Sequence, residues 1–304
     1  MNLLLTGCFR YSEDEFSQLR LLGYDVHFMQ HEAEELPLCA SEIDAIVCNS
    51  IFLHHDIGDF SRLKFIQLTS AGLDRVPLDE ITKRGILIRN ARGVYSIPMA
   101  EWAVFRILEH YKQGWFFRQK QNCCCWEKHR ELRELAGTKV AVIGAGNVGQ
   151  EVAKRFQALG TLTTGFDIHT NPTVGFDSME YIAALKERVP EFDIIVITAP
   201  LLPETRGLFS RELMQVLKHD ASVVNISRGG LVDQAALIEV FSVRKDLFAA
   251  LDVFEDEPLP NTSPLWGMDN IAVSPHNSFV SDVNNSRMFN LMKTNLAEFI
   301  HSLT

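Results

Sequence analysis

A glycine-rich motif stands directly after an apolar run in the middle of the chain. It reads Gly144-Ala145-Gly146-Asn147-Val148-Gly149, it opens a stretch with helical periodicity, and Asp167 ends the next apolar segment. Glycines permit a tight turn close to a pyrophosphate, and a helix N-terminus offers unpaired N–H groups and partial positive charge. An acidic residue at this spacing can accept hydrogen bonds from a ribose 2′-hydroxyl. The pattern predicts a dinucleotide site, although glycine-rich turns also occur for packing reasons alone.

Three further side chains, Arg228, Glu257 and His276, follow later apolar runs and together could bind an acid and move a proton. A guanidinium presents a planar fork that suits a carboxylate, and an imidazole exchanges its proton near neutral pH. Glu257 could pair with His276 and stabilise the imidazolium. Ligands of open α/β sheets bind at the carboxyl ends of the strands, so a single site is expected.

Each of these residues has a plainer interpretation when it is taken singly. An arginine before two glycines is usually a surface charge, the acidic triplet 255–257 is usually a solvated turn, and a histidine after proline is more often structural than catalytic. A metal site built from the triplet and His276 is disfavoured, because adjacent carboxylates point in different directions in an extended chain. The pair His54-His55 is interpreted as surface. No metal is expected.

Alternating apolar runs and amphipathic stretches must position these groups. The short apolar runs predict parallel strands separated by helices. They cover residues 3–5, 26–29, 45–48, 65–68 and 86–88, and then 140–143, 161–166, 194–198, 222–226, 249–253 and 271–273. Helical spacing of apolar residues predicts a long, largely buried helix from Ile97 to about Tyr111 and a final helix over 284–302. The predicted fold is therefore α/β, with two doubly wound parallel sheets.

Composition and charge restrict the class of partner. The chain has 304 residues, of which 46% are hydrophobic and 22% charged, as is ordinary for a globular protein of two domains. Its net charge of −10 argues against a nucleic-acid surface, which relies on clustered Lys and Arg. A small-molecule partner is favoured.

The cysteines and the apolar runs bear on the compartment. Six cysteines lie in the first half of the chain without C-x-x-C spacing, and three of them are consecutive, Cys123-Cys124-Cys125. Consecutive residues do not readily converge on one metal, so reduced thiols are favoured over a disulfide framework or a metal cluster. No apolar run reaches the length of about eighteen residues that a membrane-spanning helix needs. A cytoplasmic protein without membrane association is expected.

Taken together, these motifs resemble the NAD-dependent D-isomer-specific 2-hydroxyacid dehydrogenases. The resemblance covers nearly the whole chain in order, and the combination of motifs is highly specific. It rests on the glycine motif with Asp167 and on the segments 70–74, 100–101, 200–205, 225–230, 252–258 and 275–276.

The resemblance implies a role for each matching residue. Arg228 would grip the substrate carboxylate and polarise its 2-oxo group, His276 would be the general acid/base, and Glu257 would hold and charge the histidine. Backbone N–H groups of Ala71 and Gly72 would bind the carboxylate from the other domain. The implied cofactor contacts are Gly144, Gly146, Asn147, Val148 and Gly149 at the pyrophosphate, Asp167 at the ribose, Pro200 and Thr205 at the cleft, and Ser227 and Asp252 at the nicotinamide.

The resemblance also implies the domain organisation. The first domain of the family is discontinuous and is closed by the C-terminal helix. A flavodoxin-like substrate domain would therefore comprise residues 1–96 and 277–304. A Rossmann nucleotide-binding domain, residues 97–276, would be inserted in it.

The loop after the third predicted strand departs from one branch of the family. The phosphoglycerate-specific branch carries a basic residue there, whereas residues 48–53 contain no Lys or Arg. Phe52 and Leu53 in this loop, with Tyr95 near the hinge, indicate an apolar pocket. The expected substrate is a 2-oxo acid with an aliphatic or aromatic side chain, or a range of acids that includes small ones.

Asp167 bears on the choice of cofactor. A carboxylate repels a 2′-phosphate and accepts hydrogen bonds from a 2′-hydroxyl, and residues 168–171 contain no Arg or Lys. NAD is therefore expected rather than NADP.

Two other activities are less favoured alternatives, and the resemblance also bears on the assembly state. The same fold and residues occur in NAD(H)-sensing corepressors, whose extra disordered tails this chain lacks, and a formate-type dehydrogenase is disfavoured by the apolar pocket. The segment 112–135 is rich in aromatic residues, which is typical of an interface or of packing onto its own domain. Members of the family pair through the nucleotide domain, so the resemblance implies a homodimer.

Overall fold

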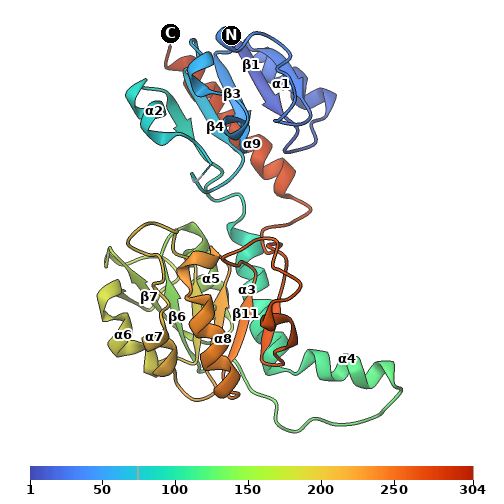
Figure 1. Ribbon diagram of the computed structural model, residues 1–304, viewed down its shortest axis with the longest axis vertical. Coiled ribbons are helices and arrows are strands. Elements are labelled where there is room, and N and C mark those ends of the chain that lie inside the picture. The colour runs from blue at the N-terminus through green and yellow to red at the C-terminus, as the bar shows by residue number, and fades with distance from the viewer. Residues whose placement is uncertain (74, 304) are drawn as a thin grey trace. The chain divides into compact units, whose positions relative to one another are not determined.

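The computed structural model describes residues 1–73 and 75–303, and the chain divides into two compact units. Unit 1 comprises Met1–Tyr95 and Ser281–Thr304, and unit 2 comprises Ser96–Val280. Each unit is built on one parallel sheet with helices packed against it (Figure 1). The predicted α/β class with two parallel sheets is confirmed. Asp74, which ends the family-like segment 70–74, lies outside the described residues.

The sheet of unit 1 has five strands in the order β2-β1-β3-β4-β5. This is the flavodoxin-like order, in which the chain reverses direction across the sheet between β1 and β3. The strands are β1 (Asn2–Thr6), β2 (Asp25–Met29), β3 (Ala45–Cys48), β4 (Phe65–Leu68) and β5 (Leu87–Arg89). β3 and β4 are buried along their whole length, which explains why their residues are apolar apart from the buried Gln67.

Three helices pack on this sheet, and the last of them comes from the end of the chain. They are α1 (Glu13–Leu21), α2 (Leu78–Lys83) and α9 (Asn284–His301). The ring of Phe299 on α9 stacks on Phe65 of β4 with 4.8 Å between centroids, and the hydroxyl of Tyr24 donates to the carbonyl of Leu296 at 2.9 Å. The C-terminal segment is thus part of the core of unit 1.

The sheet of unit 2 has seven strands in the order β12-β11-β10-β9-β6-β7-β8. Counted from β6, this is the Rossmann order, with its switch point between β6 and β9. The strands are β6 (Lys139–Ile143), β7 (Leu162–Asp167), β8 (Ser178–Tyr181), β9 (Ile194–Ile197), β10 (Ser222–Asn225), β11 (Phe248–Leu251) and β12 (Ile271–Val273). β8 was not predicted from the sequence, because this edge strand is partly exposed to solvent and contains no apolar run.

Helices cover both faces of this sheet, because alternate residues of each strand point to opposite sides. Ala141 and Ile143 belong to one apolar cluster, Val140 and Val142 to another. The helices of unit 2 are α3 (Ser96–Tyr111), α4 (Gly114–Asn122), α5 (Asn147–Ala158), α6 (Leu185–Arg188), α7 (Arg211–Gln215) and α8 (Gln234–Val243), and all of them except α4 lie against the sheet. The aromatic segment 112–135 contains α4, for which the sequence predicted no helix, and α4 projects from the body of unit 2 (Figure 1).

Candidate functional site

The glycine motif forms the turn between β6 and α5, and the backbone packing there accepts only glycine at two positions. Gly144 has φ +98°, and a Cβ on it would lie 2.7 Å from the backbone nitrogen of Ala199. A Cβ on Gly149 would lie 2.0 Å from the carbonyl oxygen of Gly144. Both glycines are therefore needed to bring the turn against the neighbouring backbone.

Gly146 is different, because it faces open space. A Cβ placed on it would have no atom within 4 Å, and it directly precedes Asn147 and Val148, the first two residues of α5. The first turn of a helix presents N–H groups that lack intrahelical acceptors. A clear approach beside such a turn fits the pyrophosphate of a dinucleotide.

Asp167, the last residue of β7, is tied to the same turn. Its Oδ2 atom accepts a hydrogen bond of 2.7 Å from the backbone N–H of Ala145. This bond sets the carboxylate beside the glycine turn, which is where a ribose hydroxyl of a bound dinucleotide would need an acceptor.

The loop after β9 holds the glycine turn from its other side. Thr198 Oγ1 donates to the carbonyl of Gly144 at 2.7 Å. Further along this loop, Thr205 Oγ1 donates to the carbonyl of Pro200 at 2.7 Å and accepts from the N–H of Leu202 at 2.8 Å. Pro200 and Thr205 thus form one internally bonded turn.

The turn that carries Arg228 follows β10 and is organised by a buried asparagine. Asn225 accepts from the N–H of Ser227 at 3.1 Å and donates through Nδ2 to the carbonyl of Arg228 at 3.1 Å. The hydroxyl of Ser227 donates to the carbonyl of Ala199. A Cβ on Gly229 would lie 1.9 Å from the carbonyl carbon of Phe254, so the turn packs directly against the loop after β11.

His276 and Glu257, which follow the neighbouring strands β12 and β11, contact each other through their side chains. His276 Nδ1 lies 2.8 Å from Oε2 of Glu257, while Oε1 of Glu257 accepts from the N–H of Phe254 at 3.0 Å. Each of the two side chains is 36% exposed, so a ligand can reach the pair. His276 has φ +49°, in the left-handed region that residues with a side chain adopt uncommonly.

Asp252, which is fully buried at the end of β11, holds the backbone around His276. Its carbonyl accepts from the N–H of His276 at 2.8 Å. Its carboxylate accepts from Ser274 Oγ at 2.5 Å and from the N–H groups of Asn277 and Ser278 at 2.9 and 2.8 Å. The strained conformation of His276 is therefore maintained by a buried carboxylate.

Strand register brings the three reactive side chains to one edge of the unit 2 sheet. Asn225 of β10 pairs with Leu251 of β11, and Leu251 pairs with Val273 of β12. Arg228, Glu257 and His276 follow these ends, and the glycine turn follows β6 at the same edge. The structure thus gathers the predicted catalytic residues and the predicted cofactor residues of unit 2 at the carboxyl ends of its strands.

The candidate residues of unit 1 are distributed differently. Ala71 and Gly72 follow β4, and Asn90 Nδ2 donates to the carbonyl of Ala71 at 2.7 Å. Phe52 and Tyr95 do not share a cluster, because Phe52 packs with the apolar residues on one face of the sheet and Tyr95 with those on the other.

Asn225 and Ser274 are two contributors for which the sequence analysis assigned no role. Asn225 forms an Asx turn, a pattern that an Asn followed two residues later by Ser can signal. Ser274 carries no such local signal, since its partner Asp252 lies on another strand.

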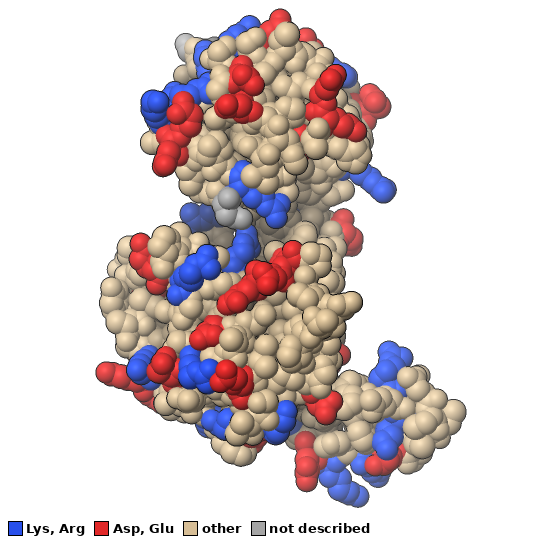
Figure 2. Space-filling model, viewed as in Figure 1, with Lys and Arg blue, Asp and Glu red and all other residues tan. Residues whose placement is uncertain are grey.

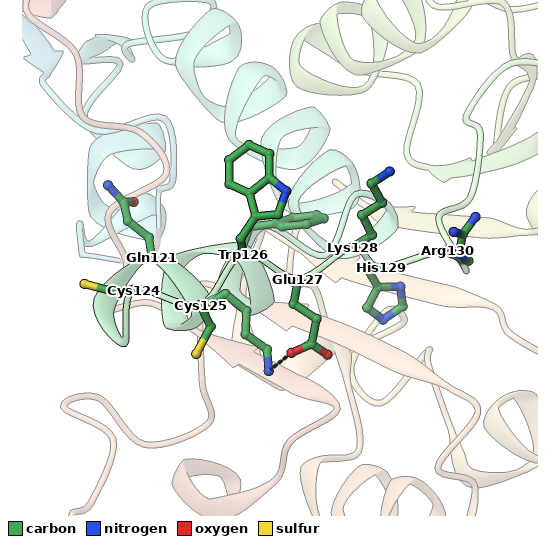
Figure 3. Close-up of a pocket in the computed structure, with 10 residues that line it drawn as sticks. Gln121, Cys124, Cys125, Trp126, Glu127, Lys128, His129 and Arg130 are labelled. Atoms are coloured by element: carbon green, nitrogen blue, oxygen red, sulfur yellow. Dashed lines mark ion pairs between the residues drawn. The ribbon is translucent and has the colours of Figure 1, made fainter.

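One hollow lies in the projecting segment of unit 2. It measures about 810 Å³ and is lined by α4 and by residues that follow it, including Cys124, Cys125 and Trp126. Lys120 pairs with Glu127 at 2.5 Å across it (Figure 3). Among residues 1–73 and 75–303, no group of three or more His, Cys, Asp or Glu side chains could hold a metal ion.

The surface and helices show how charge and apolarity are distributed. On the face drawn in Figure 2, acidic and basic side chains are interspersed without a continuous basic area. In the described part of the chain, every helix is too short or too polar to cross a bilayer.

Comparison with known proteins adds a family assignment for most of unit 2. The family model of the D-isomer specific 2-hydroxyacid dehydrogenase NAD binding domain matches residues 103–278. This match spans β6 to β12 and includes every unit 2 residue of the predicted catalytic and cofactor sites.

Individual relatives carry related names. A D-3-phosphoglycerate dehydrogenase of Methanocaldococcus jannaschii is 35% identical over 71% of this chain and 41% of its own length, so the chain spans less than half of that relative. A hydroxypyruvate reductase of Blautia hydrogenotrophica is 28% identical over 78% of this chain and 76% of its own. A solved D-isomer specific 2-hydroxyacid dehydrogenase family protein of Aeromonas salmonicida superposes with a TM-score of 0.85 at 28% identity and covers 99% of this chain and 96% of its own.

Proposed function

Because this chain belongs to the D-isomer specific 2-hydroxyacid dehydrogenase family, we propose that it interconverts a 2-oxo acid and the D-2-hydroxy acid with NAD(H). The observation that carries the proposal is the contact of 2.8 Å between Nδ1 of His276 and Oε2 of Glu257. It lies at the same sheet edge as the Arg228 turn and the glycine turn, which are the parts that a hydride-transfer reaction on an anionic substrate requires.

The side chains of unit 2 divide the proposed chemistry between them. Arg228 binds the substrate carboxylate through two parallel hydrogen bonds and polarises the 2-oxo group. His276 uses Nδ1 toward Glu257, so its Nε2 gives a proton to the carbonyl oxygen during reduction and removes it during oxidation. Glu257 orients the ring and stabilises its protonated form. A protonated ring beside a guanidinium supplies preorganised positive charge where the oxyanion develops.

The proposed cofactor residues are those that the glycine turn and its neighbours contribute. When bound, NADH supplies the hydride. The residues proposed to hold it are Gly144, Gly146, Asn147, Val148 and Gly149 at the pyrophosphate, Asp167 at the ribose, Pro200 and Thr205 along the cleft, and Ser227 and Asp252 at the nicotinamide. We propose NAD in preference to NADP, because Asp167 repels a 2′-phosphate and residues 168–171 carry no Arg or Lys.

Unit 1 is proposed to contribute the remaining substrate contacts. The backbone N–H groups of Ala71 and Gly72 bind the carboxylate, and Phe52 and Tyr95 contact the rest of the substrate. Residues 48–53 carry no Lys or Arg. The proposed substrate is therefore a 2-oxo acid with an uncharged aliphatic or aromatic side chain, although one relative is named for a phosphorylated acid.

We also propose that the protein is a homodimer in which the projecting segment contributes to the interface. Trp126 is 99% exposed, and Trp115 on α4 is 50% exposed. Large aromatic side chains that are exposed together are typical of interfaces. Light scattering at the mass of a monomer would contradict this assembly.

The proposed activity is tested by NADH oxidation with a panel of 2-oxo acids, with Arg228→Ala and His276→Ala as controls. Turnover of apolar 2-oxo acids that both substitutions abolish is expected. Tight NADH binding without turnover of any acid would instead favour an NAD(H)-sensing protein. Turnover of 3-phosphohydroxypyruvate far ahead of every apolar acid would overturn the proposed substrate class.

A further inference from the structure

Glu32, just after β2, lies where the carboxyl ends of three strands of unit 1 meet. Oε1 of its carboxylate accepts from Thr6 Oγ1 at the end of β1 at 2.7 Å and from the N–H of Asn49 after β3 at 2.6 Å. Oε2 accepts from the N–H and the hydroxyl of Ser50 at 2.6 and 2.8 Å. Two consecutive backbone N–H groups and two hydroxyls thus converge on one carboxylate.

Such a set of donors is what proteins use to bind an anion. Successive backbone N–H groups in a loop form a concavity with positive potential, and a serine hydroxyl completes it. In this chain the anion that these donors bind is the carboxylate of Glu32 itself. Cys8 Sγ adds a longer contact of 3.4 Å to Oε1, and His55 contacts the backbone carbonyl of Glu32 rather than its carboxylate.

The carboxylate is ionised at neutral pH. Burial by itself would raise the pKa of Glu32, but the hydrogen bonds from Asn49, Thr6 and Ser50 outweigh it and hold the pKa below its usual range. A fixed negative charge therefore stands beside the loop after β3. Residues 48–53 offer no Lys or Arg to neutralise it.

We propose that Glu32 is a specificity-determining residue: it saturates the donors of the Asn49-Ser50 loop and makes unit 1 select against substrates with a second negative charge. The inference rests on the proposed function, because the same loop carries Phe52. A distal carboxylate or phosphate that approaches this loop meets donors that are already occupied and a charge of the same sign. An uncharged side chain meets neither obstacle.

Matched substrates separate charge from size. The ratio of kcat/KM for 2-oxoglutarate to that for 2-oxopentanoate is measured in the wild type and in Glu32→Gln, and 3-phosphohydroxypyruvate serves as a second dianion. We expect the ratio to rise by at least about tenfold in Glu32→Gln, mainly through KM of the dianion. The control Glu34→Gln changes an exposed carboxylate two residues away and leaves the ratio unchanged. Ser50→Ala removes one bond to Glu32 but not its charge, and also keeps the discrimination.

A second substitution tests the proposal even if Glu32→Gln does not fold. Asn49→Lys leaves Glu32 in place, keeps the backbone N–H of residue 49, and adds a compensating charge. We expect it to raise the same ratio. An unchanged ratio in Asn49→Lys and in a folded Glu32→Gln would overturn the proposal, as would an equal rise in Glu34→Gln.

A binding assay tests the anion site without any turnover. Inorganic phosphate is added during thermal unfolding of the full chain. We expect phosphate to raise the unfolding midpoint of Glu32→Gln more than that of the wild type or Glu34→Gln, since only in the first variant does an amide nitrogen, which cannot accept, replace one of the two acceptor oxygens. Equal increases of the unfolding midpoint in all three proteins would refute the proposal that the Glu32 carboxylate occupies these donors. If the wild type turned over no 2-oxo acid, the proposed function would fail while this assay still decided the role of Glu32.

Discussion

The imidazole of His276 and the carboxylate of Glu257 lie 2.8 Å apart, Nδ1 to Oε2, although the two residues follow different strands. The contact fixes the ring and leaves Nε2 as the atom for proton transfer. The backbone of His276 is held at φ +49° by bonds to Asp252, so the ring orientation is maintained from both the side chain and the main chain.

Substitution of this pair is expected to reduce turnover with little effect on cofactor binding. Removal of a positioned general acid lowers rates by about 10²–10⁴-fold, so His276→Asn should lose that much in kcat. Glu257→Gln should lose less, because the general acid remains and only the carboxylate that orients its ring is removed. Steady-state kinetics and NADH fluorescence titration measure both. Retention of kcat within about tenfold in His276→Asn would contradict the assigned role.

Arg228→Lys should weaken substrate binding and lower turnover, although the charge is retained. A lysine cannot provide the planar pair of parallel donors that a carboxylate accepts, so kcat/KM should fall by about 10²-fold. Arg211, which pairs with Glu239 on the surface, provides the control Arg211→Lys. Equal kinetics for the Arg228 variant and this control would show that Arg228 does not bind the substrate.

Asp167→Ser should shift the cofactor preference toward NADPH. The substitution removes the charge that repels a 2′-phosphate, and it also removes the acceptor of the Ala145 N–H. The ratio of kcat/KM for NADH to that for NADPH is expected to fall by at least about tenfold. Asp269→Ser, at an exposed position, is the matched control. A wild type that prefers NADPH would remove the basis of this prediction.

Substitution by alanine should lower the stability at one glycine of the motif and the NADH affinity at another. Gly149→Ala places a methyl group 2.0 Å from the Gly144 carbonyl oxygen and should lower the unfolding midpoint by about 3–10 °C. Gly146→Ala meets no protein atom within 4 Å, so it should unfold near the wild-type temperature yet bind NADH more weakly. Thermal unfolding with and without NADH distinguishes the two. An undiminished NADH affinity in Gly146→Ala would place the pyrophosphate elsewhere.

His110 on α3 should make the stability depend on pH in the acid range. Burial, and then the nearby Arg133 guanidinium, lower its pKa from 6.5 to about 4, and its ring stacks on Phe248 with 3.9 Å between centroids. Between these two values the unfolded chain binds more protons than the folded one. The contribution of the neutral His110 ring to the free energy of unfolding is therefore complete above about pH 6.5. It is lost as the pH falls toward about 4.

The corresponding experiment is urea unfolding at about pH 7 and about pH 4.5 for the wild type and His110→Phe, which keeps the stacking. Over this pH interval, the free energy of unfolding should fall by about 2 kcal/mol more in the wild type than in the variant. His219→Gln, at a solvated position, should behave as the wild type. The same loss in His110→Phe as in the wild type would assign the acid lability to other groups.

Much of the architecture followed from local patterns. Strands buried on both faces, such as β3 and β9, appear in the sequence as short apolar runs, and the glycine turn is visible because only glycine tolerates its backbone. β8 and α4 were not predicted, since β8 carries no apolar run and α4 is polar apart from its aromatic residues. The amphipathic pattern of 284–302 predicted α9, but its packing on β4 is a property of unit 1 as a whole.

The sequence by itself determined the α/β class, the positions of the apolar strands and of the first and last long helices, and the residue types that a family of hydride-transfer enzymes uses. Periodicity and steric tolerance act within a few residues, so they can be inferred from short windows. The tertiary structure alone decided that Asp252 braces His276, that Asn225 organises the Arg228 turn, and that Glu32 occupies the donors of Thr6 and Ser50. Glu32 is 26 residues from Thr6 and 18 from Ser50. Such partners meet only because the strand order of a parallel sheet brings the ends of separate strands to one edge.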